Sequence, residues 1–234
     1  LMADPLVLAL GGSLLRPEES ERHAWLSSLA KMLLGCEGSI GIVVGGGAAA
    51  REAIELAIGS GENDLAALDE IGIAATRVNA TIVSQILQDA GLDVFAGIPS
   101  DVASAAQSLE AHSVVVMGGT RPGHTTDNVA IRLAIEVKAA RCLIATNVAY
   151  VYSSDPRVDS GARPIESMTL SELQDIVGPP VHGKAGGSSV IDPIGVQAAI
   201  DNNLPLAVLD GSEMDRVADA LAGKPFDGTR IEVG

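Results

Sequence analysis

Three apolar segments of the chain each end in a glycine-rich turn and are followed by a stretch with a helical pattern. The segments and their turns are Pro5 to Leu10 with Gly11-Gly12-Ser13, Ser39 to Val44 with Gly45-Gly46-Gly47, and Ser113 to Met117 with Gly118 to Asp127. Short apolar runs bounded by glycine are typical of buried strands, and strands that alternate with helices indicate a parallel sheet. This order predicts an α/β fold with a mostly parallel central sheet.

The rest of the chain keeps this alternation. Further strands are expected at Asp93 to Ile98, Arg141 to Ala145, Leu206 to Leu209 and Thr229 to Val233. Helices are expected at Asp64 to Ala90, Asp101 to Leu109, Asn128 to Val137, Thr169 to Val177 and Glu213 to Leu221, with another that opens at Asp192-Pro193. Two of these starts carry capping signals, a Thr-x-x-Glu box at Thr169 and an aspartate before proline at Asp192. The segment from Tyr150 to Pro156 is predicted to be rich in turns.

The glycine-rich turns have the composition of an anion-binding site. Parallel strands place their carboxyl ends at one edge of the sheet, so the three turns are expected to converge on one crevice. Glycine lets backbone amides approach a phosphate closely, and the first two turns are each expected to start a helix, whose N-terminus favours an anion. The third turn adds Arg121 and His124, and Thr126 or Asp127 is expected to cap the helix after it. The alternative is an ordinary strand-to-helix connection.

Composition limits the partners of the chain. Its 234 residues carry a net charge of −15, with 30 acidic against 15 basic residues, which disfavours binding to nucleic acid polymers. No apolar run is long enough to span a membrane, and the N-terminus lacks the basic region of a signal peptide. Cys36 and Cys142 belong to no metal-binding spacing and suit a reducing compartment. These features predict a soluble, cytoplasmic protein that binds small ligands.

Two nucleotide-binding motifs are matched only in part. Gly178 to Lys184 fits the glycine and lysine spacing of a P-loop, but Ala185 stands where the magnesium-binding hydroxyl belongs, so this motif is rejected. Gly45-x-Gly47-x-x-Ala50 fits a dinucleotide fingerprint, but the second strand that should end in an acid does not follow it. The four histidines have no metal-binding spacing, and no serine stands in a nucleophile elbow. We therefore predict no protein metal ligands.

Several anion-binding turns with few basic side chains fit phosphoryl transfer between two phosphate-bearing ligands. This reaction depends on positioning and on charge neutralisation more than on covalent chemistry. An acceptor phosphate loses its second proton at a pKa of about 6, so it needs no general base at neutral pH. Lys184 is predicted to stabilise the transferring group, while Arg51 and Arg121 hold the donor and acceptor phosphates. The alternative for each cation is a role on the solvated surface.

The motifs together resemble the amino acid kinase family, and within it most resemble the archaeal-type UMP kinases. The resemblance covers essentially the whole chain and rests on Gly11-Gly12-Ser13, Val43 to Gly47 with Arg51, Asp69 to Asn79, Met117 to Asp127, Thr146-Asn147-Val148 with Asp155-Pro156, and Lys184 to Pro193. It implies a three-layer αβα sandwich in a single domain, 1–234, with an acceptor-binding lobe over about 1–138 and an ATP-binding lobe over about 139–234. It further implies transfer of the γ-phosphate of ATP to UMP with Mg²⁺ in pyrimidine nucleotide synthesis. A homo-oligomer, dimer-based and usually hexameric, is also implied.

The resemblance also assigns binding roles to individual residues. UMP is expected to contact Gly46, Asp69, Thr120, Arg121, Pro122, Gly123, His124, Thr125 and Thr126. ATP is expected to contact Gly12, Ser13, Gly47, Arg51, Thr146, Tyr152 and Asp155, with Lys184 and Arg51 as catalytic residues. Within the UMP set, Asp69 would contact the ribose, and the pair Thr125-Thr126 the acceptor phosphate.

Three positions depart from the pattern of the family. Ala9 stands where relatives carry a lysine or an acid, Ala149-Tyr150 replaces Asp-Gly, and Gly187 replaces a common serine. We expect Tyr150 to narrow the choice of phosphate donor. Two alternatives stay open: another small-molecule phosphotransferase of the family, and a non-catalytic nucleotide-binding sensor or storage protein. Retention of Asp69 and of the two threonines favours a nucleoside monophosphate as acceptor.

Overall fold

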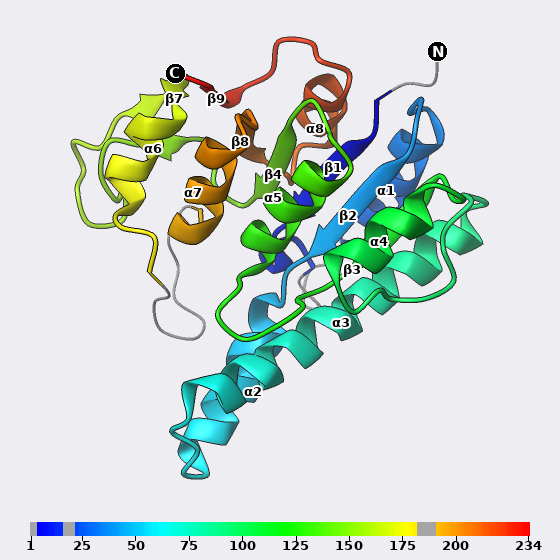
Figure 1. Cartoon of the computed structure of the whole chain (residues 1–234), viewed down its shortest axis with the longest axis horizontal. Coiled ribbons are helices and arrows are strands. Elements are labelled where there is room, and N and C mark those ends of the chain that lie inside the picture. The colour runs from blue at the N-terminus through cyan, green and yellow to red at the C-terminus, as the bar shows by residue number, and fades with distance from the viewer. Residues whose placement is uncertain (1–3, 16–21, 182–190) are drawn as a thin grey trace.

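The computed structural model describes residues 4–15, 22–181 and 191–234, and its centre is a seven-stranded sheet (Figure 1). The strands follow the order β3-β2-β1-β4-β8-β9-β7. Their bounds are β1 Leu6–Leu10, β2 Ile40–Val44, β3 Val114–Met117, β4 Cys142–Thr146, β7 Ser167–Thr169, β8 Leu206–Asp210 and β9 Gly228–Glu232. Strands β3, β2, β1, β4 and β8 are parallel neighbours, and β9 pairs antiparallel with β8. The predicted mostly parallel sheet is confirmed.

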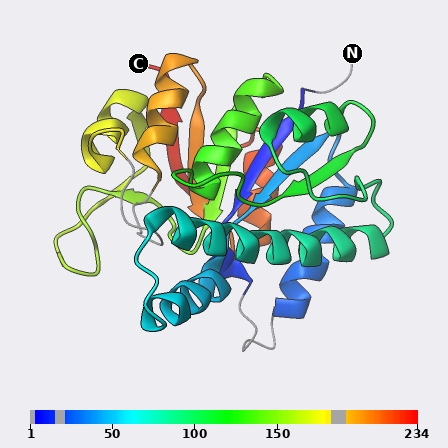
Figure 2. The same cartoon turned by 60° about the horizontal axis from the view of Figure 1, so that its bottom comes forward.

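Helices cover both faces of this sheet and form the three layers of an αβα sandwich (Figures 1 and 2). They are α1 Arg22–Leu34, α2 Gly47–Gly59, α3 Leu65–Asp89, α4 Val102–Leu109, α5 Thr126–Glu136, α6 Leu170–Val177, α7 Pro193–Asp201 and α8 Met214–Leu221. On one face, alternate strand residues such as Val7 and Ala9 pack in the core with α4, α5, α6 and α7. On the other face, Leu8 and Leu10 pack with α1, α3 and α8. Because both faces are buried, the strands β1, β2 and β3 carry no polar side chain at any position.

Helix α3 is the longest helix and forms a hairpin with α2 that projects beyond the body of the protein (Figures 1 and 2). The body end of this hairpin lies beneath the carboxyl ends of the strands, where α3 packs against β2 and β3. Asp64 caps the helix by accepting a hydrogen bond from the Ala66 amide, which agrees with the predicted start. In the part of the chain that the structure describes, no helix has the length and apolar character needed to cross a membrane.

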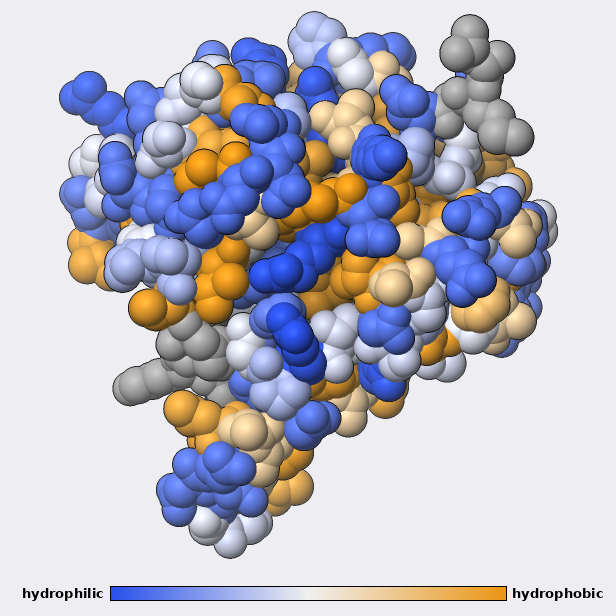
Figure 3. All heavy atoms as spheres, in the orientation of Figure 1, coloured by the Kyte–Doolittle hydropathy of each residue, from blue (hydrophilic) through white to orange (hydrophobic). Residues whose placement is uncertain are grey.

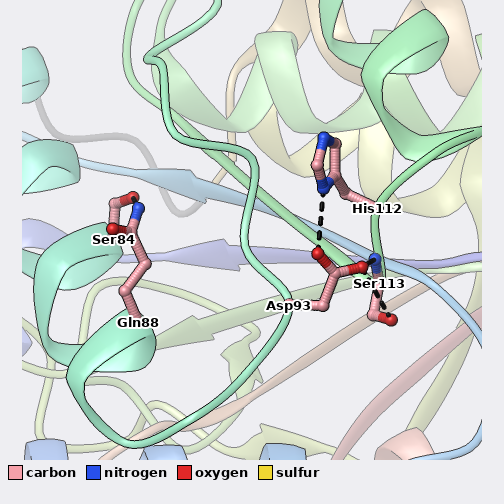
Figure 4. A network of polar contacts seen from close by, with 5 residues as sticks. All are labelled: Ser84, Gln88, Asp93, His112 and Ser113. Carbon is pink, nitrogen blue, oxygen red and sulfur yellow. Dashed lines mark hydrogen bonds and ion pairs between the residues drawn. The ribbon is translucent and has the colours of Figure 1, made fainter.

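The predicted strand from Asp93 to Ile98 is wrong. Only Val94 forms a bridge, to Val114, and no ladder follows it. The carboxylate of Asp93 instead accepts hydrogen bonds from the amide of Ser113 and lies 2.9 Å from Nδ1 of His112 (Figure 4). These side-chain contacts satisfy polar groups just before β3 begins.

Two further predictions need correction. The first glycine turn leads into a single 3-10 turn, Gly12–Leu14, and not directly into a helix, because α1 spans Arg22–Leu34. In the segment expected to be rich in turns, β5 (Val151–Tyr152) pairs with β6 (Pro164–Ile165) to form a small second sheet. The capping signals are confirmed: Thr169 and Glu172 form the capping box of α6, and Asp192 caps α7 ahead of Pro193.

Candidate active site

The first two glycine turns lie in direct contact at the carboxyl ends of β1 and β2. A side chain added at Gly12 would overlap the amide nitrogen of Gly47 and would lie 2.6 Å from the carbonyl oxygen of Gly45. Gly47 also has a φ of +58°, a conformation that L-residues other than glycine rarely adopt. A Cβ at Gly45 would lie 3.4 Å from the hydroxyl of Thr126, so the third turn reaches the same place. The predicted convergence of the three turns is therefore present in the structure.

Side chains of α3 form hydrogen bonds with the second and the third of these turns. The Asn79 carboxamide donates hydrogen bonds to the carbonyl oxygens of Gly45 and Gly46, at 2.8 and 3.0 Å. The Thr76 hydroxyl accepts a hydrogen bond from the amide of Gly119 at 2.7 Å. Both side chains belong to buried residues. The Gly45 amide donates a hydrogen bond to the carbonyl oxygen of Leu10 at 2.8 Å, so the second turn is held from β1 as well as from α3. Sequence reasoning assigned no role to Thr76 or Asn79, although polar residues within an apolar helical stripe are a usable signal.

The third turn is tied to α3 near the start of that helix. Asp69 accepts a hydrogen bond from the amide of Gly123 at 2.7 Å, and Gly123 has a φ of +81°. Beside this contact, guanidinium nitrogens of Arg121 lie 3.0 to 3.4 Å from the ring nitrogens of His124. The predicted acceptor loop from Thr120 to Thr126 thus forms one compact turn, and its Arg121 is exposed. Contacts of these residues with UMP remain a prediction.

The N-cap of helix α5 lies one residue before the nearer of the two predicted caps. Its N-cap is Thr125, and not Thr126 or Asp127, because the Thr125 backbone is extended and its hydroxyl accepts a hydrogen bond from the amide of Asn128. Thr126 is the first helical residue, so its amide and the next ones lie at the positive end of the helix dipole. The helix therefore begins two residues before the predicted start at Asn128.

Asp127, in the first turn of α5, has a perturbed carboxyl group. Burial raises its pKa to about 7, and the negative charge of Asp192 adds to the rise. Desolvation disfavours the charged form of an acid, and a second carboxylate nearby disfavours it further. Asp127 was absent from the predicted site residues. Because this partly buried acid with a raised pKa lies in the first turn of α5, next to Thr126, we add it to the candidate site.

The predicted ATP side is more open. Thr146 ends β4 next to the first glycine turn, since a Cβ at Gly11 would lie 3.3 Å from the Thr146 Cα. Farther out, the carboxylate of Asp155 accepts hydrogen bonds from Nε and Nη2 of Arg157 at 3.0 and 2.9 Å. These hydrogen bonds lower the pKa of Asp155. The rings of Tyr150 and Tyr152 meet edge to face with centroids 6.4 Å apart.

Of the remaining positions that the sequence singled out, Ala9, Ser13 and Arg51 belong to the described residues, and two others do not. Ser13 lies in the 3-10 turn, and Arg51 lies exposed in the early part of α2, as predicted. Ala9 is buried in β1, 2% exposed, so this departure from the family pattern is filled by apolar packing. Lys184, the predicted catalytic lysine, and Gly187 lie outside the described residues. Their roles remain predictions from the sequence.

The side chains of the site also indicate how Mg²⁺ could be bound. Across residues 4–15, 22–181 and 191–234, no group of three or more histidine, cysteine, aspartate or glutamate side chains is placed to hold a metal ion. Magnesium in phosphoryl-transfer enzymes is commonly held by substrate phosphates and water with one or two carboxylates, and needs no protein cage. The site is therefore compatible with an ion that arrives bound to a nucleoside triphosphate.

Comparison with known proteins agrees with this geometry. The family model described as "Amino acid kinase family" matches residues 4–210. A uridylate kinase of Halorubrum lacusprofundi is 38% identical over 97% of this chain and 92% of its own length. A uridylate kinase of Methanothrix thermoacetophila is 37% identical, with 97% and 98% covered. The crystal structure of uridylate kinase from Archaeoglobus fulgidus superposes with a TM-score of 0.81 at 34% identity, covering 97% of this chain and 99% of that one.

Proposed function

Because the chain belongs to the amino acid kinase family, we propose that it is a uridylate kinase that phosphorylates UMP with ATP. The observation that carries the proposal is the meeting of three glycine turns and the N-terminus of α5 at one edge of the sheet. Relatives matched over nearly their whole length are uridylate kinases, which supports the choice of acceptor.

The reaction forms a bond between an oxygen of the UMP phosphate and the γ-phosphorus of ATP. The bond from that phosphorus to the bridging oxygen breaks, and ADP leaves with the electron pair. At neutral pH the UMP phosphate is mostly dianionic, so the protein does not have to remove a proton. The chain supplies positioning and charge neutralisation: backbone amides of Gly46, Gly47 and Thr126, and the cations Arg51 and Lys184. Mg²⁺ would neutralise the phosphates of ATP when bound.

The binding roles divide the chain into two parts. Residues up to about 138 would bind UMP through the loop from Thr120 to Thr126 with Asp69. Residues from about 139 would bind ATP together with the first glycine turn, through Thr146, Tyr152 and Asp155. This division agrees with the sheet order, in which β1 lies between β2 and β4, so both substrates would meet over β1.

The proposed reaction and the free cysteines indicate the pathway and the compartment of the enzyme. Formation of UDP places it in pyrimidine nucleotide synthesis. Both cysteines are free thiols, Cys142 buried and Cys36 half-buried, which suits the reducing cytoplasm.

We also propose a homo-oligomer, dimer-based and hexameric. Helix α3 exposes Val78 at 58% and Ile82 at 47%, one turn apart, and α2 exposes Leu56 at 72%. Figure 3 shows apolar residues at the surface of this projecting hairpin beside its hydrophilic tip. Burial of such a patch against a second copy removes apolar area from water. Light scattering coupled to size exclusion measures the mass, and a monomer at micromolar concentration would contradict the assembly.

One assay tests the proposed function. Purified protein is mixed with Mg-ATP and, separately, UMP, dUMP, CMP and non-nucleotide acceptors, and ADP release is followed with a coupled system. We expect turnover with UMP and at least about tenfold lower kcat/KM with CMP, because acceptor sites that hydrogen-bond a base reject its analogues. Binding of ATP without turnover on any acceptor would contradict the proposal and favour the nucleotide sensor.

Lys184→Ala tests the predicted charge stabiliser. We expect kcat to fall by at least about a hundredfold with a smaller change in the Kd for UMP, because the cation acts on charge that develops in transfer. Lys224→Ala is the matched control, since Lys224 is paired with Asp219 on the surface. A kcat within a few-fold of wild type would remove Lys184 from the mechanism.

A further inference from the structure

Asp192 connects the N-termini of two helices that come from different parts of the chain. Its Oδ1 accepts hydrogen bonds from the amides of Ile194 and Gly195, at 2.7 and 3.2 Å, and so caps α7. Its Oδ2 accepts a hydrogen bond from the hydroxyl of Thr125 at 2.8 Å and from the amide of the same residue at 3.3 Å. Thr125 is the N-cap of α5. One carboxylate, on a residue only 4% exposed, thus holds the start of both helices.

This arrangement uses the one hydrogen-bond donor of the Thr125 hydroxyl within the protein. The hydroxyl has one proton, which it donates to Asp192, and it accepts from the amide of Asn128. A phosphate dianion needs donors, and the Thr125 proton is already committed to a carboxylate. The carboxylate also lies 2.8 Å from the hydroxyl oxygen, where it would repel an incoming phosphate.

Thr126 has a different position. As the first residue of α5 it places its hydroxyl 3.4 Å from the Cβ position of Gly45, on the side of the second glycine turn. The two adjacent threonines therefore face different partners. Thr125 faces Asp192 and α7, and Thr126 faces the place where the glycine turns converge.

We propose that Asp192 is a positioning residue that orients the acceptor-phosphate site by holding Thr125, and that Thr126 alone of the pair offers its hydroxyl to the phosphate. The proposal rests on the proposed function and refines it. It replaces a pair of phosphate-binding threonines by one binding residue and one residue that fixes the helix N-terminus. The acceptor phosphate is then held by amides and a hydroxyl whose direction is set from α7, in the part of the chain expected to bind ATP.

The test is a double-mutant cycle of Asp192→Asn and Thr125→Val in the full chain. Asparagine is as good an N-cap as aspartate, so the amides of Ile194 and Gly195 keep an acceptor while Thr125 loses its own. Each single variant is expected to lower kcat by about tenfold or more with a smaller change in KM for UMP, because the phosphate is misplaced rather than unbound. The double variant should be no worse than the poorer single variant. Thr125→Ser, which keeps the hydroxyl, should restore activity to within about twofold.

Thr126→Val is the contrasting variant. It should raise the Kd for UMP, measured by calorimetry, by about tenfold, while Thr125→Val should leave that Kd within about threefold. Equal losses of UMP binding at both threonines, or strictly additive effects in the cycle, would overturn the proposal. Wild-type protein without turnover on UMP would overturn the proposed function. In that event, the same cycle read in free energies of unfolding reports on the Asp192–Thr125 contact, and additivity there overturns the proposal independently.

Discussion

The proposed UMP side and the proposed ATP side of the candidate site are built in different ways. On the UMP side, buried side chains of α3 hold the glycine turns: Asn79 binds two carbonyls and Thr76 binds an amide. On the ATP side, Asp155 pairs with Arg157, two residues away, at the surface. The first set consists of long-range contacts out of solvent, and the second of local contacts in solvent.

The difference indicates which side of the candidate site is pre-organised. A buried polar contact is costly to break because the remaining partner stays unsatisfied, so the UMP side has one well-defined arrangement. Exposed ion pairs contribute little to stability, so the ATP side can change its residues at small cost. The departures Ala149 and Tyr150 lie on this tolerant side. Four substitutions test the contrast between the two sides.

Gly12→Ala should have the largest effect, because its Cβ would overlap the Gly47 amide and force the first two turns apart. We expect a loss of about 3 kcal/mol in the free energy of unfolding and at least about a hundredfold in kcat/KM. Urea denaturation and the coupled assay measure the two quantities. Gly59→Ala is the control, since no atom lies within 4 Å of its Cβ position. Similar behaviour of the two variants would contradict the close contact of the turns.

Asn79→Leu replaces the carboxamide beneath the second turn with an apolar side chain of nearly the same volume, so the hydrogen-bond donor is lost. The carbonyls of Gly45 and Gly46 lose their buried partner, so we expect a loss of about 2 kcal/mol and a fall in UMP turnover of about tenfold or more. Gln85→Leu on the exposed face of α3 should cost less than about 0.5 kcal/mol, because its amide pairs only with Asp89 at the surface. Equal losses would show that the amide on α3, and not its contact with the turn, sets stability.

Asp127→Asn should change how stability depends on pH. The folded-state pKa of about 7 lies above the unfolded value, so the folded protein binds the extra proton. Wild-type stability should therefore fall by about 1 kcal/mol as pH rises from about 4 to about 7 and then level off, less than the full shift implies because the carboxyl is only partly buried. The asparagine variant should lack this fall and be the more stable protein at about pH 8. Melting temperatures across this range measure the effect, and Glu110→Gln controls for the loss of one charge.

Tyr150→Gly should have the smallest effect on stability and a selective effect on donor choice. Removal of the ring is expected to raise the ratio of kcat/KM for GTP to that for ATP about fivefold, with KM for UMP unchanged. Tyr150→Phe keeps the ring and should keep the ratio. Unchanged ATP and GTP kinetics in the glycine variant would remove the basis for a role of Tyr150 in donor choice.

Sequence patterns predicted most of the fold because the signals are local. An apolar run buried on both faces indicates a parallel strand whatever its neighbours are, and the caps at Asp64, Thr169 and Asp192 lie next to the amides they bind. The strand expected at Asp93 to Ile98 is wrong because strand pairing depends on a partner distant in sequence, and only Val94 forms a bridge to β3.

The sequence alone indicated the mostly parallel sheet, the glycine-rich turns that meet at its edge, and the family to which the chain belongs. The tertiary structure alone decided which polar side chains support the site. Asn79 lies 34 residues from the Gly45 carbonyl it binds, Thr76 lies 43 from Gly119, and Asp192 lies 67 from Thr125. Such contacts depend on how helices and turns pack in three dimensions, and a buried hydrogen bond has no periodicity along the chain that a sequence pattern could report.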